Sequence, residues 1–244
     1  MLVTIRLPHR IAYSRTEVVS DVAVHALGLT AAVMAVPILI TRTWSLGGDA
    51  IVTAGVAIYG ATLIAMILCS ALYNMTHREN GGGVLRRLDH SAIYLKIAGT
   101  YTPFAILSPN PSGGFLIWIW TCAALGAGLR SFAQDRWRAA MIGLYLVMGW
   151  SGVVAGGALF DEMSSRAFAL VLGGGILYTV GFAFYLLPRL PFHRTIWHLF
   201  VIIASAVFFL AVATHVLGRA RRAPRATSGM KCKPGPIGAF TPCQ

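Results

Sequence analysis

Seven apolar stretches, each long enough to cross a lipid bilayer as a helix, dominate this sequence. A membrane-spanning helix needs about 20 mostly apolar residues, and the breaks between the stretches hold glycines and prolines typical of helix ends. The sequence therefore predicts an all-α membrane protein, a seven-transmembrane helix bundle. The seven predicted helices cover residues 20–41, 50–74, 89–108, 113–131, 139–160, 166–187 and 195–217.

Composition excludes an ordinary soluble domain. Hydrophobic residues make up 57% of the chain and charged residues only 11%, whereas about a quarter of the residues in a soluble domain are charged. The net charge of +12 would suggest nucleic acid in a soluble protein, but here the arginines lie between apolar segments and indicate topology. We therefore expect membrane lipids as partners and no nucleic acid.

Arginine distribution predicts that the amino end is cytoplasmic. With that orientation most arginines of the connections lie inside, and only Arg42 and Arg166 lie outside. This gives a cytoplasmic segment over 1–19, a transmembrane domain over 20–217, and a basic, Pro/Gly-rich, disordered tail over 218–244. The basic tail would then lie outside, and one helix more or fewer would return it to the cytoplasm.

Polar residues of the predicted helices converge on one membrane face. Ionisable groups are costly in lipid and indicate a functional site. Several also recur every three or four residues, which places them on one helical face. Carboxylates, a hydroxyl and neutral imidazoles together can hold a zinc ion with an open position for water. The converging residues are Glu17, Ser20, Asp21, His25, Ser70, Asn74, His77, Asp89, His90, His193 and His198.

Other polar and small residues carry separate expectations. Asp89 can also be a first-turn acid favoured by the helix dipole, or the counter-ion of a neighbouring arginine. Lys96 is expected to face the bundle interior, and His215 to lie at the membrane interface. Gly152 and Gly156 are spaced to let helix backbones approach closely.

Four segments resemble the hemolysin III branch of the progestin and adipoQ receptor family. They read EVVSDVAVHALGL, CSALYN, RRLDHSAIYLKIAGTYTPF and IWHLFV, and the resemblance covers roughly residues 17–217. It implies seven helices with a cytoplasmic amino end, in a multi-pass protein of the bacterial inner membrane. It also implies a zinc site with one histidine from a Ser-xxx-His pattern, two from a His-xxx-His pattern, and an aspartate that positions water.

The correspondence with that zinc site is incomplete. Ser70, Asp89 and His198 match the serine, the aspartate and the last histidine, but Asn74 and Arg194 occupy the places of the other two histidines. One hypothesis is a shifted zinc site, with His198, His193 and His77 as metal ligands. The other is a metal-free site in which an Arg194–Asp89 pair replaces the metal electrostatically.

Two functions follow from the resemblance. The first is a zinc-dependent hydrolase of lipid amides, in which Asp89 acts as a base on water and Ser70 supports the oxyanion. The alternative is a membrane-homeostasis or pore-forming protein, non-enzymatic and without metal.

Overall fold

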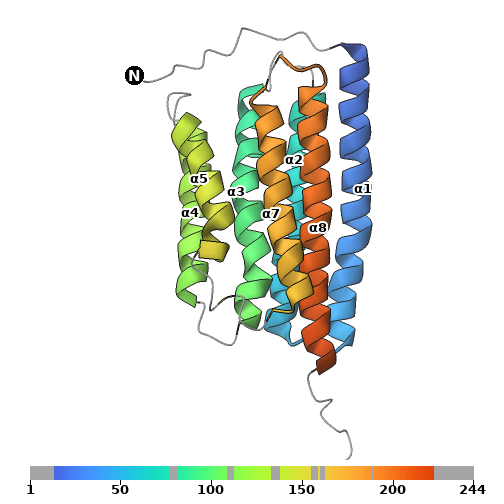
Figure 1. Ribbon diagram of the computed structural model, residues 1–244, viewed down its shortest axis with the longest axis vertical. Coiled ribbons are helices and arrows are strands. Elements are labelled where there is room, and N and C mark those ends of the chain that lie inside the picture. Colours follow the sequence, from blue (N-terminus) through green and yellow to red (C-terminus); the bar gives the residue numbers. More distant parts are fainter. Residues whose placement is uncertain are drawn as a thin grey trace, which may run out of the picture.

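Seven α-helices run side by side along one common axis in the part of the chain that the computed structural model describes (Figure 1). The described residues are 14–76, 82–108, 113–132, 138–154, 159, 163–187 and 189–222, and they contain no strand. The predicted seven-helix bundle is confirmed, whereas its orientation in the membrane stays a prediction. The helices are α1 (Arg15–Ser45), α2 (Ala50–Met75), α3 (Gly82–Leu107), α4 (Gly113–Phe132), α5 (Arg138–Val154), α7 (Ser165–Tyr185) and α8 (His193–Arg222).

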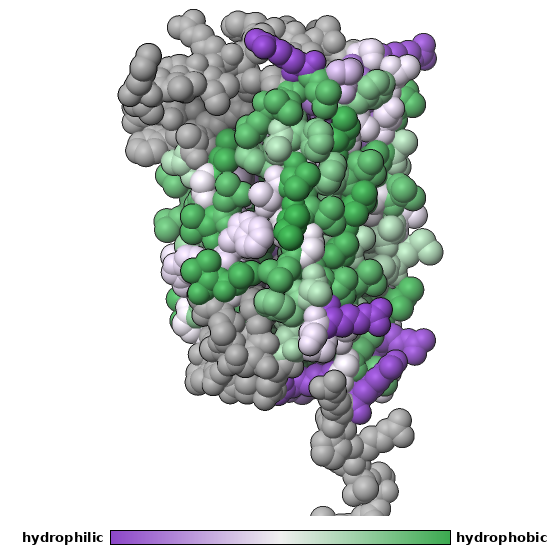
Figure 2. All heavy atoms as spheres, viewed as in Figure 1, coloured by the Kyte–Doolittle hydropathy of each residue, from purple (hydrophilic) through white to green (hydrophobic). Residues whose placement is uncertain are grey.

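The outer surface of the bundle is that of a multi-pass membrane protein. Figure 2 shows a broad hydrophobic band across the molecule, with hydrophilic residues gathered at its two ends. Among the described helices, α1, α2, α4, α7 and α8 are long and apolar enough to cross a membrane, and α5 holds a shorter apolar stretch. α3 is more polar because it carries Arg86, Arg87, Asp89 and Lys96.

Side-chain caps fix where α1 and α2 begin. The Glu17 N–H donates to Ser14 Oγ at 3.2 Å, and the Ser14 N–H donates to Glu17 Oε2 at 2.8 Å. Asp49 caps α2 in a similar way through its Oδ1. Such caps satisfy backbone N–H groups that the first turn leaves free. As a result α1 begins at Arg15, earlier than the residue 20 predicted, and the polar residues expected at its start lie within the helix.

Two other helices differ from their predicted bounds. α3 starts at Gly82, so Asp89 lies about two turns inside the helix. The first-turn role considered for Asp89 is therefore wrong, because the helix dipole acts within the first turn. α8 continues to Arg222, into the segment predicted as a tail, and residues 223–244 lie outside the described part of the chain.

Contact between an aromatic ring and a glycine brings α3 and α5 together. Tyr101 of α3 donates its hydroxyl to the Gly149 carbonyl at 2.6 Å and accepts from the Gly152 N–H at 3.1 Å. A Cβ atom at Gly152 would lie only 2.8 Å from the Tyr101 hydroxyl oxygen. Gly152 therefore packs against the Tyr101 side chain, whereas a close approach of helix backbones there stays a prediction. Gly156 lies outside the described residues.

Chain direction brings four helix ends together at one end of the bundle. α1, α3 and α8 begin at this end, and α2 finishes there, at the top of Figure 1. α1 packs against α2 and α8, and α2 packs against α3. Polar residues near these four helix ends are therefore held close together at a similar depth.

Candidate functional site

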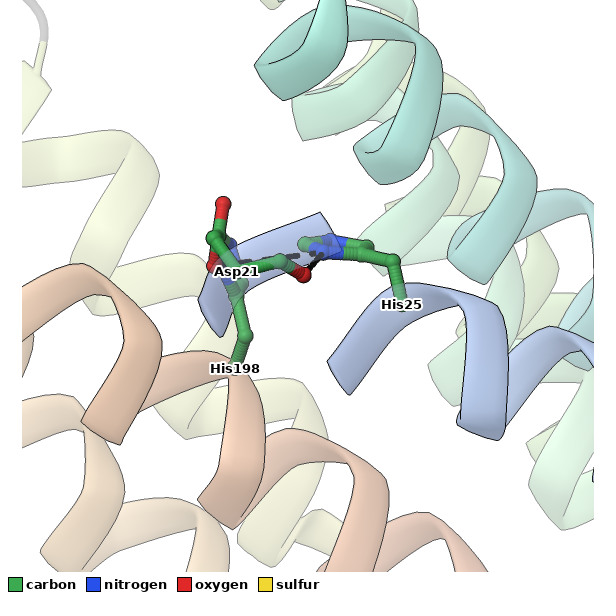
Figure 3. A group of neighbouring side chains, drawn as sticks. All are labelled: Asp21, His25 and His198. Atoms are coloured by element: carbon green, nitrogen blue, oxygen red, sulfur yellow. Dashed lines mark hydrogen bonds and ion pairs between the residues drawn. The ribbon is translucent and has the colours of Figure 1, made fainter. Parts of the chain in front are cut away.

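Side chains from α1, α2 and α8 form one hydrogen-bonded group at this end of the bundle, which we call the polar cluster. Figure 3 shows three members, Asp21, His25 and His198, meeting between α1 and α8. All three are buried, and ionisable groups in such a position require partners. The full polar cluster consists of Asp21, His25, Ser70, Asn74, Arg194 and His198.

His25 links α1 to α2. Its Nδ1 lies 2.8 Å from the backbone oxygen of Asp21, one turn earlier in α1. A carbonyl oxygen can only accept, so Nδ1 carries the proton and Nε2 holds a lone pair. Ser70 Oγ lies 3.1 Å from His25 Nε2. The Ser70 hydroxyl is therefore the donor in this bond.

Asn74 and Arg194 close the cluster on the side of α8. Asn74 Nδ2 donates to the Ser70 backbone oxygen at 2.8 Å and to Ser70 Oγ at 3.3 Å. Arg194 Nη2 donates to Asn74 Oδ1 and also lies 3.6 Å from Asp21 Oδ2. The sequence led us to the hypothesis of an Arg194–Asp89 pair. The structure gives Arg194 an ion pair with Asp21, and Asp89 also lies within electrostatic reach of Arg194.

Asp21 is the centre of the cluster because its two carboxylate oxygens face different cations or donors. His198 Nδ1 lies 2.5 Å from Oδ1, and Arg194 approaches Oδ2. The His198 ring also packs edge-on against His25, with ring centroids 4.4 Å apart. Hydrogen bonds to an ionised group are roughly twice as strong as neutral ones, so Asp21 joins α1 firmly to α8.

The two residues predicted to be catalytic come together beside these contacts. Asp89 of α3 lies within interaction distance of Ser70, His198 and Arg194. Its side chain is 14% exposed, and its carboxylate is 3.8 Å from Nδ1 of His90. The structure thus brings Asp89, Ser70 and His198 to one place, while their roles remain proposals.

The other predicted metal ligands are placed differently. His193 is the first residue of α8, is buried, and lies within electrostatic reach of Glu17 and His198. Glu17 accepts the Phe192 N–H at 2.9 Å, so it ties α1 to the segment that precedes α8. His77 lies outside the described residues.

Asp21 and His25 are central to the site but were left out of the predicted ligand set. That set followed the family resemblance, which singled out positions in the second, third and seventh helices. The signal for the missed pair was their four-residue spacing in an otherwise apolar helix, because residues at that spacing share one face. Both were recognised only as members of the wider polar group.

Two further polar residues are buried elsewhere in the bundle. Lys96 is 3% exposed, and its Nζ lies 4.5 Å from the ring centroid of Tyr178 and 4.6 Å from that of Phe208. Its predicted inward orientation is confirmed, with cation–π contacts as partners. His215 is buried with its ring 5.5 Å from that of Phe104, and its predicted interfacial depth stays a prediction.

The resemblance implies a zinc ion, and three residues of the polar cluster are of the kinds that bind one. Asp21, His25 and His198 offer ligand atoms that all lie within 4.8 Å of one another. However, the Asp21 carboxylate is engaged by Arg194 and His198, and His25 Nε2 is engaged by Ser70. A metal cation would also lie beside the guanidinium, and like charges at short range repel strongly in a low dielectric. These residues therefore do not fit a zinc ion.

Fold and site together define a multi-pass membrane protein with an acid, imidazole, hydroxyl and guanidinium cluster near one end of a seven-helix bundle. Comparison with protein families identifies the family of this chain. The chain belongs to the haemolysin-III related family, whose model matches residues 13–209.

Individual relatives agree with this assignment. The chain is 38% identical to Hemolysin-3 of Bacillus cereus over 203 residues, which cover 82% of this chain and 92% of that protein. It is 35% identical to the Hemolysin-3 homolog of Bacillus subtilis over 199 residues, covering 80% and 92%. It is also 28% identical to the human Monocyte to macrophage differentiation factor over 163 residues, covering 64% and 67%. These similarities confirm the predicted hemolysin III branch of the progestin and adipoQ receptor family.

Proposed function

We propose that this is a multi-pass protein of the bacterial inner membrane, with a cytoplasmic amino end, that hydrolyses a lipid amide without a bound metal. The observation that carries the proposal is the position of Arg194, whose guanidinium contacts Asp21 and Asn74. It supplies a fixed positive charge beside Ser70 and His25, at positions where the resemblance implies metal ligands. The Bacillus relatives and the arginine distribution support the location.

Amide hydrolysis requires a base and a group that stabilises negative charge on the carbonyl oxygen. Asp89, beside Ser70, is suited to accept a proton from water. Asn74 carries an N–H donor beside the same hydroxyl, and Arg194 donates to the side-chain oxygen of Asn74. A pre-positioned donor of this kind is worth about 10²- to 10³-fold in rate. The cluster can thus provide electrostatic stabilisation from protein groups alone.

Metal content tests this proposal directly. Protein purified without chelator, analysed for zinc by mass spectrometry, is expected to hold well under about 0.1 ion per chain. Asn74→His combined with Arg194→His supplies the two missing imidazoles, and this variant is expected to bind about one zinc. Asn74→Gln with Arg194→Lys is the matched control, since it adds no imidazole. About one zinc per wild-type chain would contradict the proposal.

Activity is the second part of the test. Wild-type protein in lipid nanodiscs is expected to cleave a fluorescent long-chain N-acyl amide at a rate that a chelator does not change. Arg194→Ala is expected to lower that rate by about 100-fold or more, because the carbonyl oxygen loses its stabilising charge. A rate abolished by the chelator supports a zinc hydrolase instead. No cleavage in the wild type supports the non-enzymatic alternative.

A further inference from the structure

Ser70 and His25 have the geometry of a nucleophile and its base. The Ser70 hydroxyl donates to His25 Nε2 across 3.1 Å, and His25 Nδ1–H is held by the Asp21 carbonyl at 2.8 Å. An activated hydroxyl nucleophile needs such an adjacent base within hydrogen-bond reach, with the base oriented by a third group. All three parts are present between α1 and α2.

A carboxylate lies near the imidazolium that forms when His25 takes the serine proton. The nearer carboxylate oxygen of Asp21 lies 3.9 Å from His25 Nδ1, and both side chains are under 10% exposed. A buried carboxylate beside the imidazole stabilises the protonated ring during such a transfer. Asp21 therefore orients the base with its backbone oxygen and stabilises its charge with its side chain.

Asn74 can supply the donor that an oxyanion at Ser70 would need. Asn74 Nδ2 is 3.3 Å from Ser70 Oγ, so its N–H groups lie beside the bond that the oxygen would make to an acyl carbon. Arg194 donates to the amide oxygen of Asn74, and this polarises the amide and strengthens its N–H groups as donors. Such donors stabilise the negative charge of a tetrahedral intermediate.

Position in the membrane indicates which carbonyl can reach Ser70. Ser70 is partly exposed and lies one to two turns before α2 ends at Met75, or roughly 7 Å below the helix end. The polar headgroup layer on each side of a bilayer is about 5–7 Å thick. The acyl carbonyls of membrane lipids lie at the inner edge of that layer. With the end of α2 at the outer edge of the layer, they would come to about the depth of Ser70.

We propose that Ser70 is an acyl-accepting nucleophile and His25 its general base, acting on the acyl carbonyl of a membrane lipid. This assignment rests on the proposed function and gives its first step. Ser70 Oγ bonds to the carbonyl carbon while its proton passes to His25 Nε2. The bond from that carbon to the amide nitrogen then breaks, and the leaving amine takes the proton from His25. Asp89 then takes a proton from water, and the hydroxide bonds to the acyl carbon. The bond from that carbon to Ser70 Oγ breaks, the carboxylic acid leaves, and the proton held by Asp89 returns to Ser70 Oγ.

Covalent labelling tests the proposal independently of the natural substrate. Full-length protein in nanodiscs is treated with a long-chain fluorophosphonate, which reacts with activated serines, and the adduct is mapped by peptide mass spectrometry. One adduct is expected, on Ser70. His25→Ala is expected to slow labelling by about 100-fold or more, because general-base assistance is worth about 10²–10⁴.

Controls separate a reactive serine from one that only joins two helices. Ser20→Ala is the matched control for His25→Ala. Ser20 lies at the same end of the bundle, but its hydroxyl donates to the Thr16 carbonyl. The Ser20→Ala protein should therefore be labelled as fast as the wild type. The position of the adduct is read from the wild-type protein. The test therefore does not depend on a Ser70→Ala variant, which could fail to fold. An adduct at another residue, or no adduct, overturns the assignment.

The two proposals fail in different ways. Amide cleavage without an adduct on Ser70 supports the hydrolase proposal and overturns the acyl-serine step. An adduct on Ser70 without amide cleavage supports Ser70 as the nucleophile and overturns the lipid amide as the substrate.

Discussion

Arg194 is the residue on which the charge balance of the polar cluster depends. Its guanidinium is the fixed positive charge next to the buried Asp21 carboxylate. Breaking a buried pair by removing one partner is strongly destabilising, because the other charge is left without compensation. Removing both partners relieves that penalty, so the two substitutions should be far from additive.

A double-mutant cycle measures this coupling. Arg194→Ala and Asp21→Ala are each expected to lower the free energy of unfolding by about 3–5 kcal/mol. The double variant should be less destabilised than their sum by more than about 1 kcal/mol. Thermal unfolding in detergent gives the comparison, with Asp49→Ala, at the opposite end of the bundle, in place of Asp21→Ala as the matched control. Equal coupling in both cycles would contradict the assignment of Asp21 as the ion-pair partner.

The site could be predicted only in part because the rotation of each helix about its axis is not encoded in a simple pattern. The sequence located Ser70, Asp89 and His198 at a common depth, and the structure places them together. It did not identify Asp21 as the partner of Arg194, because several carboxylates were at a similar depth. Choosing among them requires the packing of α1 against α8, which depends on side-chain shape along both helices.

At the scale of the helices, apolar length predicted each of the seven helices that the described part of the chain contains, but not their ends. Spanning stretches are recognised by their hydropathy, since lipid requires about 20 apolar residues. Helix ends depend instead on local caps such as the Ser14–Glu17 pair, which extends α1 into a polar segment. The polar start of α3 was missed for the same reason, because a helix that continues beyond the hydrocarbon leaves no apolar signal.

Contact between α3 and α5 gives a test of packing at this scale. Gly152→Ala places a methyl group against the Tyr101 side chain, which is itself hydrogen-bonded to α5. We expect a loss of about 1–3 kcal/mol, because overpacking forces side chains or backbones to shift. Gly143→Ala is the matched control in the same helix, since no neighbouring atom lies within 4 Å of its added Cβ.

Unfolding of the two variants in the same detergent decides the point. The Gly143 variant should be as stable as the wild type or slightly more stable, because alanine favours helix over glycine by about 1 kcal/mol. Equal stability of both variants would show that the close approach of Tyr101 to Gly152 does not limit the packing of α3 and α5.

For the whole molecule, the odd number of helices places the two ends of the described chain on opposite sides. α1 begins at one end of the bundle and α8 finishes at the other (Figure 1). The two sides carry competing basic signals. Arg86 and Arg87 belong to the end where α1 begins, whereas Arg219 and Arg221 belong to the opposite end with the last turns of α8. The orientation of the bundle therefore depends on which of these two sets of arginines stays in the cytoplasm when the chain inserts into the membrane.

We predict that the arginines of the connections decide, since basic residues in short loops set topology and the first helix usually dominates. Green fluorescent protein inserted between α2 and α3 should then fluoresce in the cytoplasm, and alkaline phosphatase fused after the carboxyl end should be active in the periplasm. Replacing Arg219 and Arg221 by alanine should leave both signals unchanged. A fluorescent carboxyl-terminal fusion with an inactive phosphatase would reverse the orientation. It would also move the polar cluster to the periplasmic face, where its lipid substrate would come from the outer leaflet.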